Sequence, residues 1–212
     1  MTKWRFGALV GATAVLGGVG VFAMAAGAGA HGEAADQVVE IVEYTASGEL
    51  IRPKDYRTWV FVGAPLTPND MNNGSAAFPE FHNVYIDPGA YEEYKQTGKF
   101  RDGTVFIKEL VSVGQKSSFS GNGYFEGEFL GVEAMVKSAE RNPDIPGNWG
   151  FFRFTDEEAA AQGRLGNVKR TAKNVATSCV SCHAAGEQDR IFTQHYPVLR
   201  AARNAKMNPE NK

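Results

Sequence analysis

The fold class is decided by the stretch Thr104-Val105-Phe106-Ile107-Lys108-Glu109-Leu110-Val111-Ser112-Val113. It is β-branched or apolar almost throughout, which is typical of a β-strand, and a single Lys–Glu pair interrupts it. Side chains alternate between the two faces of a strand, so Lys108 shares one face with Phe106 and Glu109 shares the other with Ile107. The stretch therefore predicts a strand that carries a charged side chain among apolar neighbours.

Further strands and helices are predicted on both sides of this strand. Turn-forming residues separate a helical turn and strand within 55–63 from strand-like runs at 78–86, 124–136 and 148–154. Helical patterns occur at 91–95, 156–161 and 192–207. This spacing favours hairpins. The predicted fold class is α+β, an antiparallel β-sheet core with flanking helices, in a single domain of residues 31–212.

A second informative stretch is Cys179-Val180-Ser181-Cys182-His183, which holds the two cysteines of the chain. Two cysteines with two spacers, followed directly by His, form the attachment signature of a c-type haem. Each thiol can add to one vinyl group of the porphyrin, and the imidazole of His183 can then ligate the iron. The motif predicts a C-terminal attachment segment that binds one covalent haem c through Cys179 and Cys182, with His183 as the axial iron ligand.

The cysteine pair has two other interpretations, a short-range disulfide and a thioredoxin-like redox pair. The redox motif is expected in an early strand–helix context and does not need the adjacent His. The haem interpretation accounts for His183 as well, and the sequence favours it.

The N-terminus has the features of a secretory signal peptide. Lys3 and Arg5 supply the positive start, residues 8–26 are apolar and rich in small side chains, and Ala28-Gly29-Ala30 matches a cleavage site. An uncleaved membrane anchor is the alternative, because the apolar run is long, although it is rich in Gly and Ala rather than Leu. We expect residues 1–30 to be removed near Ala30 and the protein to be periplasmic, where c-type haem is attached in bacteria.

Charge and composition limit the possible partners. The formal net charge is −2, and it becomes −4 without residues 1–30, which contain two positive and no negative side chains. This balance argues against nucleic acid and against a basic membrane-binding surface. With 11% aromatic residues and 24 glycines, the sequence predicts a packed, turn-rich fold rather than disorder.

Lys108 has two interpretations. In the first, which the strand pattern alone favours, its side chain reaches water or pairs with a carboxylate at a sheet edge. In the second, it is an amine in an apolar haem pocket, where desolvation favours the neutral, nucleophilic form.

Several motifs together resemble the cytochrome P-460 family. They are Asp55-Tyr56-Arg57-Thr58-Trp59-Val60, Val84-Tyr85-Ile86-Asp87-Pro88, Thr97-Gly98-Lys99-Phe100-Arg101-Asp102-Gly103-Thr104, Lys108-Glu109-Leu110, Gly121-Asn122-Gly123-Tyr124-Phe125, Gly147-Asn148-Trp149 and the Cys-x-x-Cys-His. The resemblance extends over nearly the whole chain after residue 30, and the combination is more specific than the haem motif alone.

This resemblance implies a small periplasmic c-type haem protein, usually a homodimer, in which a lysine is covalently bonded to a meso carbon of the porphyrin. In the matching motif that lysine is Lys108. The implied activity is oxidation of hydroxylamine to nitrous oxide or nitrite, with nitric oxide as a related ligand and a soluble cytochrome as electron acceptor. A related branch, cytochrome c-prime beta, shares the fold, lacks the crosslink and binds gases.

By the same resemblance, Phe78 and His82 match a distal-side region. They would share one face of the strand at 78–86, where Phe78 could cover the iron and His82 could relay protons, although ordinary core and surface roles remain alternatives. Met71, Met135 and Met207 are candidate sixth ligands only in the sense that thioethers can ligate haem.

Three functions therefore compete. They are a hydroxylamine-oxidising enzyme with a Lys108–haem bond, a gas-binding or nitric-oxide-scavenging protein without the bond, and a six-coordinate electron-transfer cytochrome. Lys108 in its motif favours the first function over the second.

Overall fold

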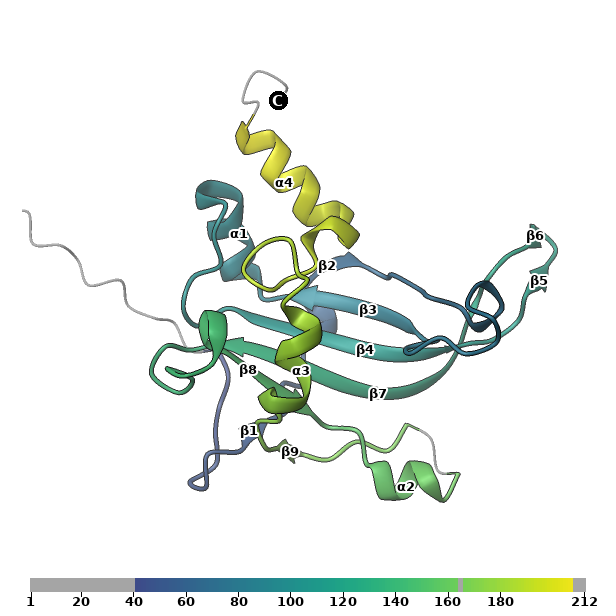
Figure 1. The fold of residues 1–212 in the computed structure, drawn as a ribbon, viewed down its shortest axis with the longest axis horizontal. Helices are drawn as coiled ribbons and strands as arrows, with labels where there is room; N and C mark the ends of the chain where they lie inside the picture. Colours follow the sequence, from purple (N-terminus) through teal and green to yellow (C-terminus); the bar gives the residue numbers. More distant parts are fainter. Residues whose placement is uncertain (1–40, 164–165, 208–212) are drawn as a thin grey trace, which may run out of the picture. The chain divides into compact units, whose positions relative to one another are not determined.

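Five antiparallel strands form the central sheet in the order β2-β3-β4-β7-β8 (Figure 1). Their bounds are β2 (Val60–Gly63), β3 (Phe81–Ile86), β4 (Val105–Val113), β7 (Glu126–Lys137) and β8 (Trp149–Arg153). This computed structural model describes residues 41–163 and 166–207. The α+β class and the antiparallel sheet predicted from the sequence are confirmed. The predicted signal peptide and its cleavage site lie outside the described residues.

Four α-helices occur in the described part of the chain. They are α1 (Pro88–Thr97), α2 (Glu157–Ala161), α3 (Ala176–His183) and α4 (Pro197–Met207). Helix α1 begins where the Asp87 carboxylate accepts a hydrogen bond from the Ala90 N–H, and it ends at Gly98, which adopts a left-handed conformation. No helix among residues 41–163 and 166–207 is long and apolar enough to cross a membrane.

Short elements complete the fold. Two-stranded pairs form between β1 (Leu50–Ile51) and β9 (Thr171–Ala172), and between β5 (Ser117–Ser118) and β6 (Gly121–Asn122). Single 3₁₀ turns are η1 (Tyr56–Thr58), η2 (Asn69–Met71), η3 (Pro146–Asn148) and η4 (Thr193–His195).

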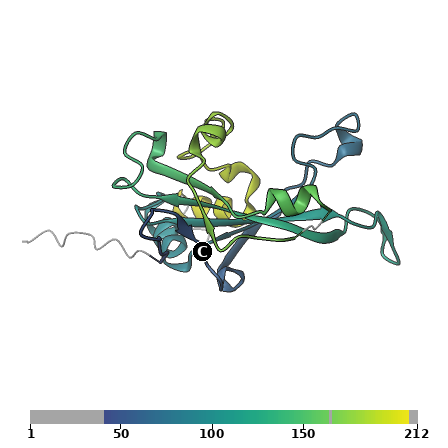
Figure 2. The same ribbon diagram turned by 90° about the horizontal axis from the view of Figure 1, so that it is seen from below.

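The sheet is buried on both faces. Helix α3 crosses one face, and the sheet seen from its edge has α3 and the loop after it on the same side (Figures 1 and 2). Phe106 and Phe151 belong to the apolar cluster on this face. Ile107 and Phe152 belong to a second cluster on the opposite face, which includes residues of β1 and β9. Because both faces carry core, the alternation along β4 sends Lys108 and Glu109 into different environments.

Two predicted boundaries are corrected by proline. Strand β3 begins at Phe81 rather than Phe78, because Pro79 has no N–H for a sheet ladder. Phe78 therefore does not share a strand face with His82. Helix α4 begins at Pro197 rather than at residue 192, and Tyr196 before it is extended, as expected of a residue preceding proline.

Glu109 is held in the second face of the sheet by the motif at residues 55–60. Its side chain is only 6% exposed, and its Oε1 accepts hydrogen bonds from the Tyr56 hydroxyl at 2.6 Å and from Arg57 Nε at 2.7 Å. Burial raises the pKa of Tyr56 far above its ordinary value, and the hydrogen bond to Glu109 adds to the shift. The Tyr-Arg pair thus anchors β4 from the side opposite to Lys108.

Replacing Glu109 with alanine is expected to lower the free energy of unfolding by about 2–3 kcal/mol, because the buried Tyr56 hydroxyl loses its acceptor. Arg57 is largely exposed and can return to water, which limits the loss. Urea denaturation measures the effect, with Glu92→Ala on α1 as the control for an exposed ion pair. A loss no larger than that of the control would mean that the cluster adds nothing to stability.

Candidate functional site

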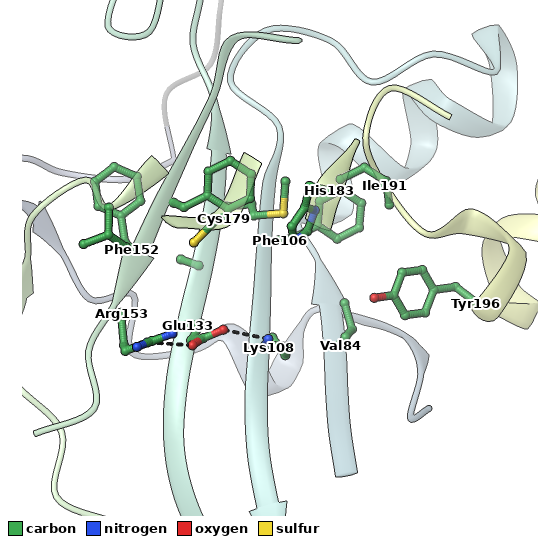
Figure 3. A pocket seen from close by; sticks show the side chains of 14 residues that line it. Val84, Phe106, Lys108, Glu133, Phe152, Arg153, Cys179, His183, Ile191 and Tyr196 are labelled. Atoms are coloured by element: carbon green, nitrogen blue, oxygen red, sulfur yellow. Dashed lines mark hydrogen bonds and ion pairs between the residues drawn. The ribbon is translucent and has the colours of Figure 1, made fainter. Parts of the chain in front are cut away.

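Two rows of side chains cross the sheet face that α3 covers. In one row Val84, Lys108, Glu133 and Arg153 lie directly opposite one another on successive strands, as Figure 3 shows. The neighbouring row consists of Phe106, Met135 and Phe151. An apolar row and a charged row therefore lie next to each other, two residues apart along each strand.

Helix α3 carries the haem-attachment motif. Cys179, Cys182 and His183 stand at positions i, i+3 and i+4, which project from one side of a helix. Both thiols are free, so the structure shows no disulfide between them. Cys179 and His183 line the pocket over the sheet, and Cys182 is exposed.

A polar side chain fastens the start of α3 to the sheet. The Asn174 side-chain oxygen accepts hydrogen bonds from the N–H groups of Phe151 in β8 and Ala176 in α3, both at 3.0 Å. Its amide donates to Asn142 at 2.8 Å. These bonds fix the helix that carries the cysteines relative to the strand below it.

The imidazole of His183 is oriented by its surroundings. Nδ1 donates a hydrogen bond to the carbonyl of Arg190 at 2.9 Å, and the ring packs between Phe151 and Phe192. Burial lowers the pKa of His183, which favours the neutral ring. The Nδ1 bond leaves Nε2 as the metal-binding nitrogen, the usual arrangement of a histidine ligand.

Three charged side chains form a chain of ion pairs in the other row. Lys108 Nζ lies 2.6 Å from Glu133 Oε2, and Arg153 Nε lies 2.9 Å from Glu133 Oε1. Burial acts to raise the pKa of Glu133, but Lys108 and Arg153 outweigh it and hold the pKa below the ordinary value. Glu133 is therefore ionised near neutral pH. The carboxylate partner expected for Lys108 exists, but it lies on a central strand rather than at a sheet edge.

These groups surround a pocket of about 600 Å³, including the space at its mouth. The pocket combines an apolar floor with a thiol, an oriented imidazole and the Lys108–Glu133–Arg153 chain. A c-type haem fits this donor set. Cys179 and Cys182 can attach the porphyrin, His183 can ligate iron, and the apolar row of Phe106, Met135 and Phe151 can pack against the macrocycle.

The two predicted distal residues lie beyond Lys108. The Phe78 ring is 6.1 Å from the His82 ring and 6.0 Å from Lys108 Nζ, although Phe78 is half exposed. His82 Nε2 lies 3.3 Å from Glu80 Oε1. Neither Phe78 nor His82 lines the pocket itself.

The methionines differ in their relation to the site. Met135 lines the pocket from the apolar row, whereas Met71 is 74% exposed on η2. The side chain of Met207 is not among those that the structure describes. Of the two whose side chains the structure describes, only Met135 lines the pocket.

Sequence reasoning did not find Glu133, Arg153 or Tyr196 as site residues. Glu133 alternates with apolar residues along β7, but its pairing with Lys108 depends on a register that the sequence does not reveal. Tyr196 turns its hydroxyl toward the pocket in Figure 3, and burial raises its pKa to about 12. It follows η4, where no motif marks it.

The fold and the site define a class of protein: an α+β domain with a cysteine–histidine segment for haem c over an antiparallel sheet. The chain matches the profile of the Cytochrome P460 family over residues 53–193, and it belongs to this family. No curated protein matches the chain.

Proposed function

We propose that this protein is a periplasmic mono-haem c-type cytochrome that oxidises hydroxylamine. The observation that carries the proposal is the presence of Lys108 in the same pocket as Cys179 and His183. Membership of the Cytochrome P460 family supports the presence of a haem and agrees with this activity. Haem bound here would supply a redox-active iron with His183 on one side.

The proposed reaction releases four electrons and needs an acceptor. Two hydroxylamine molecules give nitrous oxide, water, four protons and four electrons; one hydroxylamine and one water give nitrite, five protons and four electrons. A soluble cytochrome would take the electrons singly. The reaction therefore requires a group that removes protons from the substrate.

Glu133 is the best-placed proton acceptor. It is ionised, lies in the pocket and is held on two sides by Lys108 and Arg153, so its geometry is fixed before substrate arrives. His82, paired with Glu80 on the far side of Lys108, would carry protons onward to solvent. Phe78 would shield the substrate side from water.

Lys108 would bond through Nζ to a meso carbon of the porphyrin. Forming this N–C bond replaces one N–H and one C–H bond, and it releases two protons and two electrons to an oxidant of the peroxide class. The bond would alter the electronics of the macrocycle and so its redox potential.

Mass spectrometry of haem peptides from a proteolytic digest of the purified protein tests the crosslink. The proposal predicts one haem that carries both the Cys179–Cys182 peptide and the Lys108 peptide. Haem on the cysteine peptide alone would contradict it. Cys182→Ala protein is the control, because one thioether should then be missing while the Lys108 peptide remains bound.

The second candidate is gas binding or nitric-oxide scavenging without the crosslink, as in cytochrome c-prime beta. The ion pair between Lys108 and Glu133 favours it, since an ammonium held by a carboxylate is a poor nucleophile. Reduced protein that binds nitric oxide, carries haem only on cysteine and does not oxidise hydroxylamine would establish this candidate. A six-coordinate electron carrier would instead give a ferrous spectrum that does not respond to carbon monoxide.

The assembly is also a proposal. The family resemblance suggests a homodimer, and sedimentation of the haem-loaded protein tests it.

A further inference from the structure

The loop that follows His183 contains two strained residues in succession. Asp189 has φ 47° and Arg190 has φ 65°, in the left-handed region that costs a non-glycine residue energy. Such residues persist only where the surrounding structure holds them, and they concentrate at functional sites. The carbonyl that accepts the His183 Nδ1 hydrogen bond belongs to the second of them.

Two side chains from one rung of the sheet fasten this loop. Lys137 and Trp149 lie opposite each other on β7 and β8. Trp149 Nε1 donates to the Asp189 carbonyl at 2.9 Å, and Lys137 Nζ donates to the Asp189 carboxylate at 2.9 Å and to the Gly147 carbonyl at 2.7 Å. The backbone carbonyl and the side-chain carboxylate of Asp189 are thus both hydrogen-bonded to side chains of the sheet.

Contacts at Gln188 and Gly186 hold the rest of this loop in place. The Gln188 side chain accepts from the Tyr94 hydroxyl at 2.9 Å and donates to the Gly98 carbonyl. A Cβ at Gly186 would stand 2.4 Å from the carbonyl carbon of Arg190, so only glycine permits this close approach. The chain therefore closes on itself with the Arg190 carbonyl directed at His183.

We propose that Lys137 and Trp149 are positioning residues that hold the Arg190 carbonyl against His183 and thereby set the electron donation of this ligand to iron. The inference rests on the proposed function only in that His183 ligates the haem iron. Lys137 and Trp149 act through Asp189 and Arg190 and touch neither the substrate nor the reacting atoms.

The physical consequence concerns the iron–histidine bond. A hydrogen bond from Nδ1 to a carbonyl makes the imidazole a stronger donor, and a stronger donor favours the ferric state. Loosening the loop weakens the Nδ1 bond. The iron–histidine stretching frequency should then fall, and the ferrous fraction at a fixed applied potential should rise.

Haem-loaded Lys137→Met protein tests the inference, with Lys95→Met as the matched control, because Lys95 forms an exposed ion pair on α1. Resonance Raman spectra of the ferrous protein and spectroelectrochemical titration are the two measurements. We expect a lower iron–histidine frequency and a ferrous-to-ferric ratio several times that of the unmodified protein; a tenfold change would correspond to about 59 mV. The control should match the unmodified protein in both.

A conservative variant separates positioning from general stability. In Asp189→Asn the side-chain oxygen can still accept from Lys137, and asparagine tolerates a positive φ, so both spectroscopic values should stay near those of the unmodified protein. If Lys137→Met does not fold, Asp189→Gly carries the test, since it removes the carboxylate and relieves the strained φ.

The outcomes are distinguishable. Unchanged frequency and ratio in Lys137→Met, or in Asp189→Gly where that variant replaces it, overturn the inference and leave the proposed function intact. An iron–histidine band that is absent from the unmodified protein, or that persists in His183→Ala, overturns both. A shift in Lys137→Met that Asp189→Asn does not show supports the inference.

Discussion

Lys108→Met protein should retain haem on Cys179 and Cys182 yet lose hydroxylamine oxidation by about two orders of magnitude or more. The substitution removes the amine that would bond to the porphyrin, and it removes one of the two hydrogen-bond donors that hold Glu133. Steady-state assays with an artificial electron acceptor measure the loss. The mass of the haem peptide from the same sample shows whether the peptide that contains position 108 is still attached to the haem; we expect that it is not.

Lys116→Met is the matched control for this experiment. Lys116 pairs with Asp70 at the surface, at 2.7 Å, and is not among the residues that line the pocket. Its loss should leave both activity and the haem peptide unchanged. Full hydroxylamine oxidation by Lys108→Met protein would contradict the enzymatic role of this lysine.

Glu133→Gln should lower hydroxylamine oxidation by a factor of about 10² to 10⁴, the range for loss of a general base. The amide has nearly the same shape, and its single oxygen can still accept a hydrogen bond from Lys108 or from Arg153, but its NH2 group cannot accept from the other and the amide cannot take a proton. Haem content and ligand binding should change little. Glu128→Gln, on the exposed part of β7, provides the control and should retain full activity.

The same substitution should change how stability depends on pH. The folded-state pKa of Glu133 is below its ordinary value, so the carboxylate stabilises the fold fully above the ordinary glutamate pKa of about 4.3. That stabilisation is lost as the pH falls from there through the lower folded pKa. Glu133→Gln protein should therefore lose less stability than the unmodified protein between neutral and acid pH, as measured by urea denaturation at several pH values. Identical acid losses would show that Glu133 is not linked to folding.

The central strands and the haem segment could be predicted because their signals are local. The run from Thr104 to Val113 and the spacing of Cys179, Cys182 and His183 each contain their own pattern within a few residues. Strand boundaries were less predictable near proline, as at Pro79, because one missing N–H outweighs alternation.

The composition of the pocket depends on register, which is not local. Whether Glu133 or a neighbour stands opposite Lys108 is decided by the β4–β7 pairing, and that pairing includes bulges after Leu110. The loop around Asp189 gave no sequence signal beyond Gly186. Its conformation is imposed by Lys137 and Trp149, which lie about 40 to 50 residues earlier in the chain.

Because β4 is buried on both faces, it cannot accept the insertion or deletion of a single residue without exchanging the environments of its side chains. Deleting or inserting one residue before Lys108 would turn its side chain to the opposite face, away from Cys179 and into the Tyr56–Arg57 cluster, while Glu109 would turn toward the haem segment. The β5–β6 hairpin that follows is exposed and contributes nothing to either apolar cluster. Among variants of this protein, changes of length should therefore collect in that hairpin and be absent from the strand that leads to it.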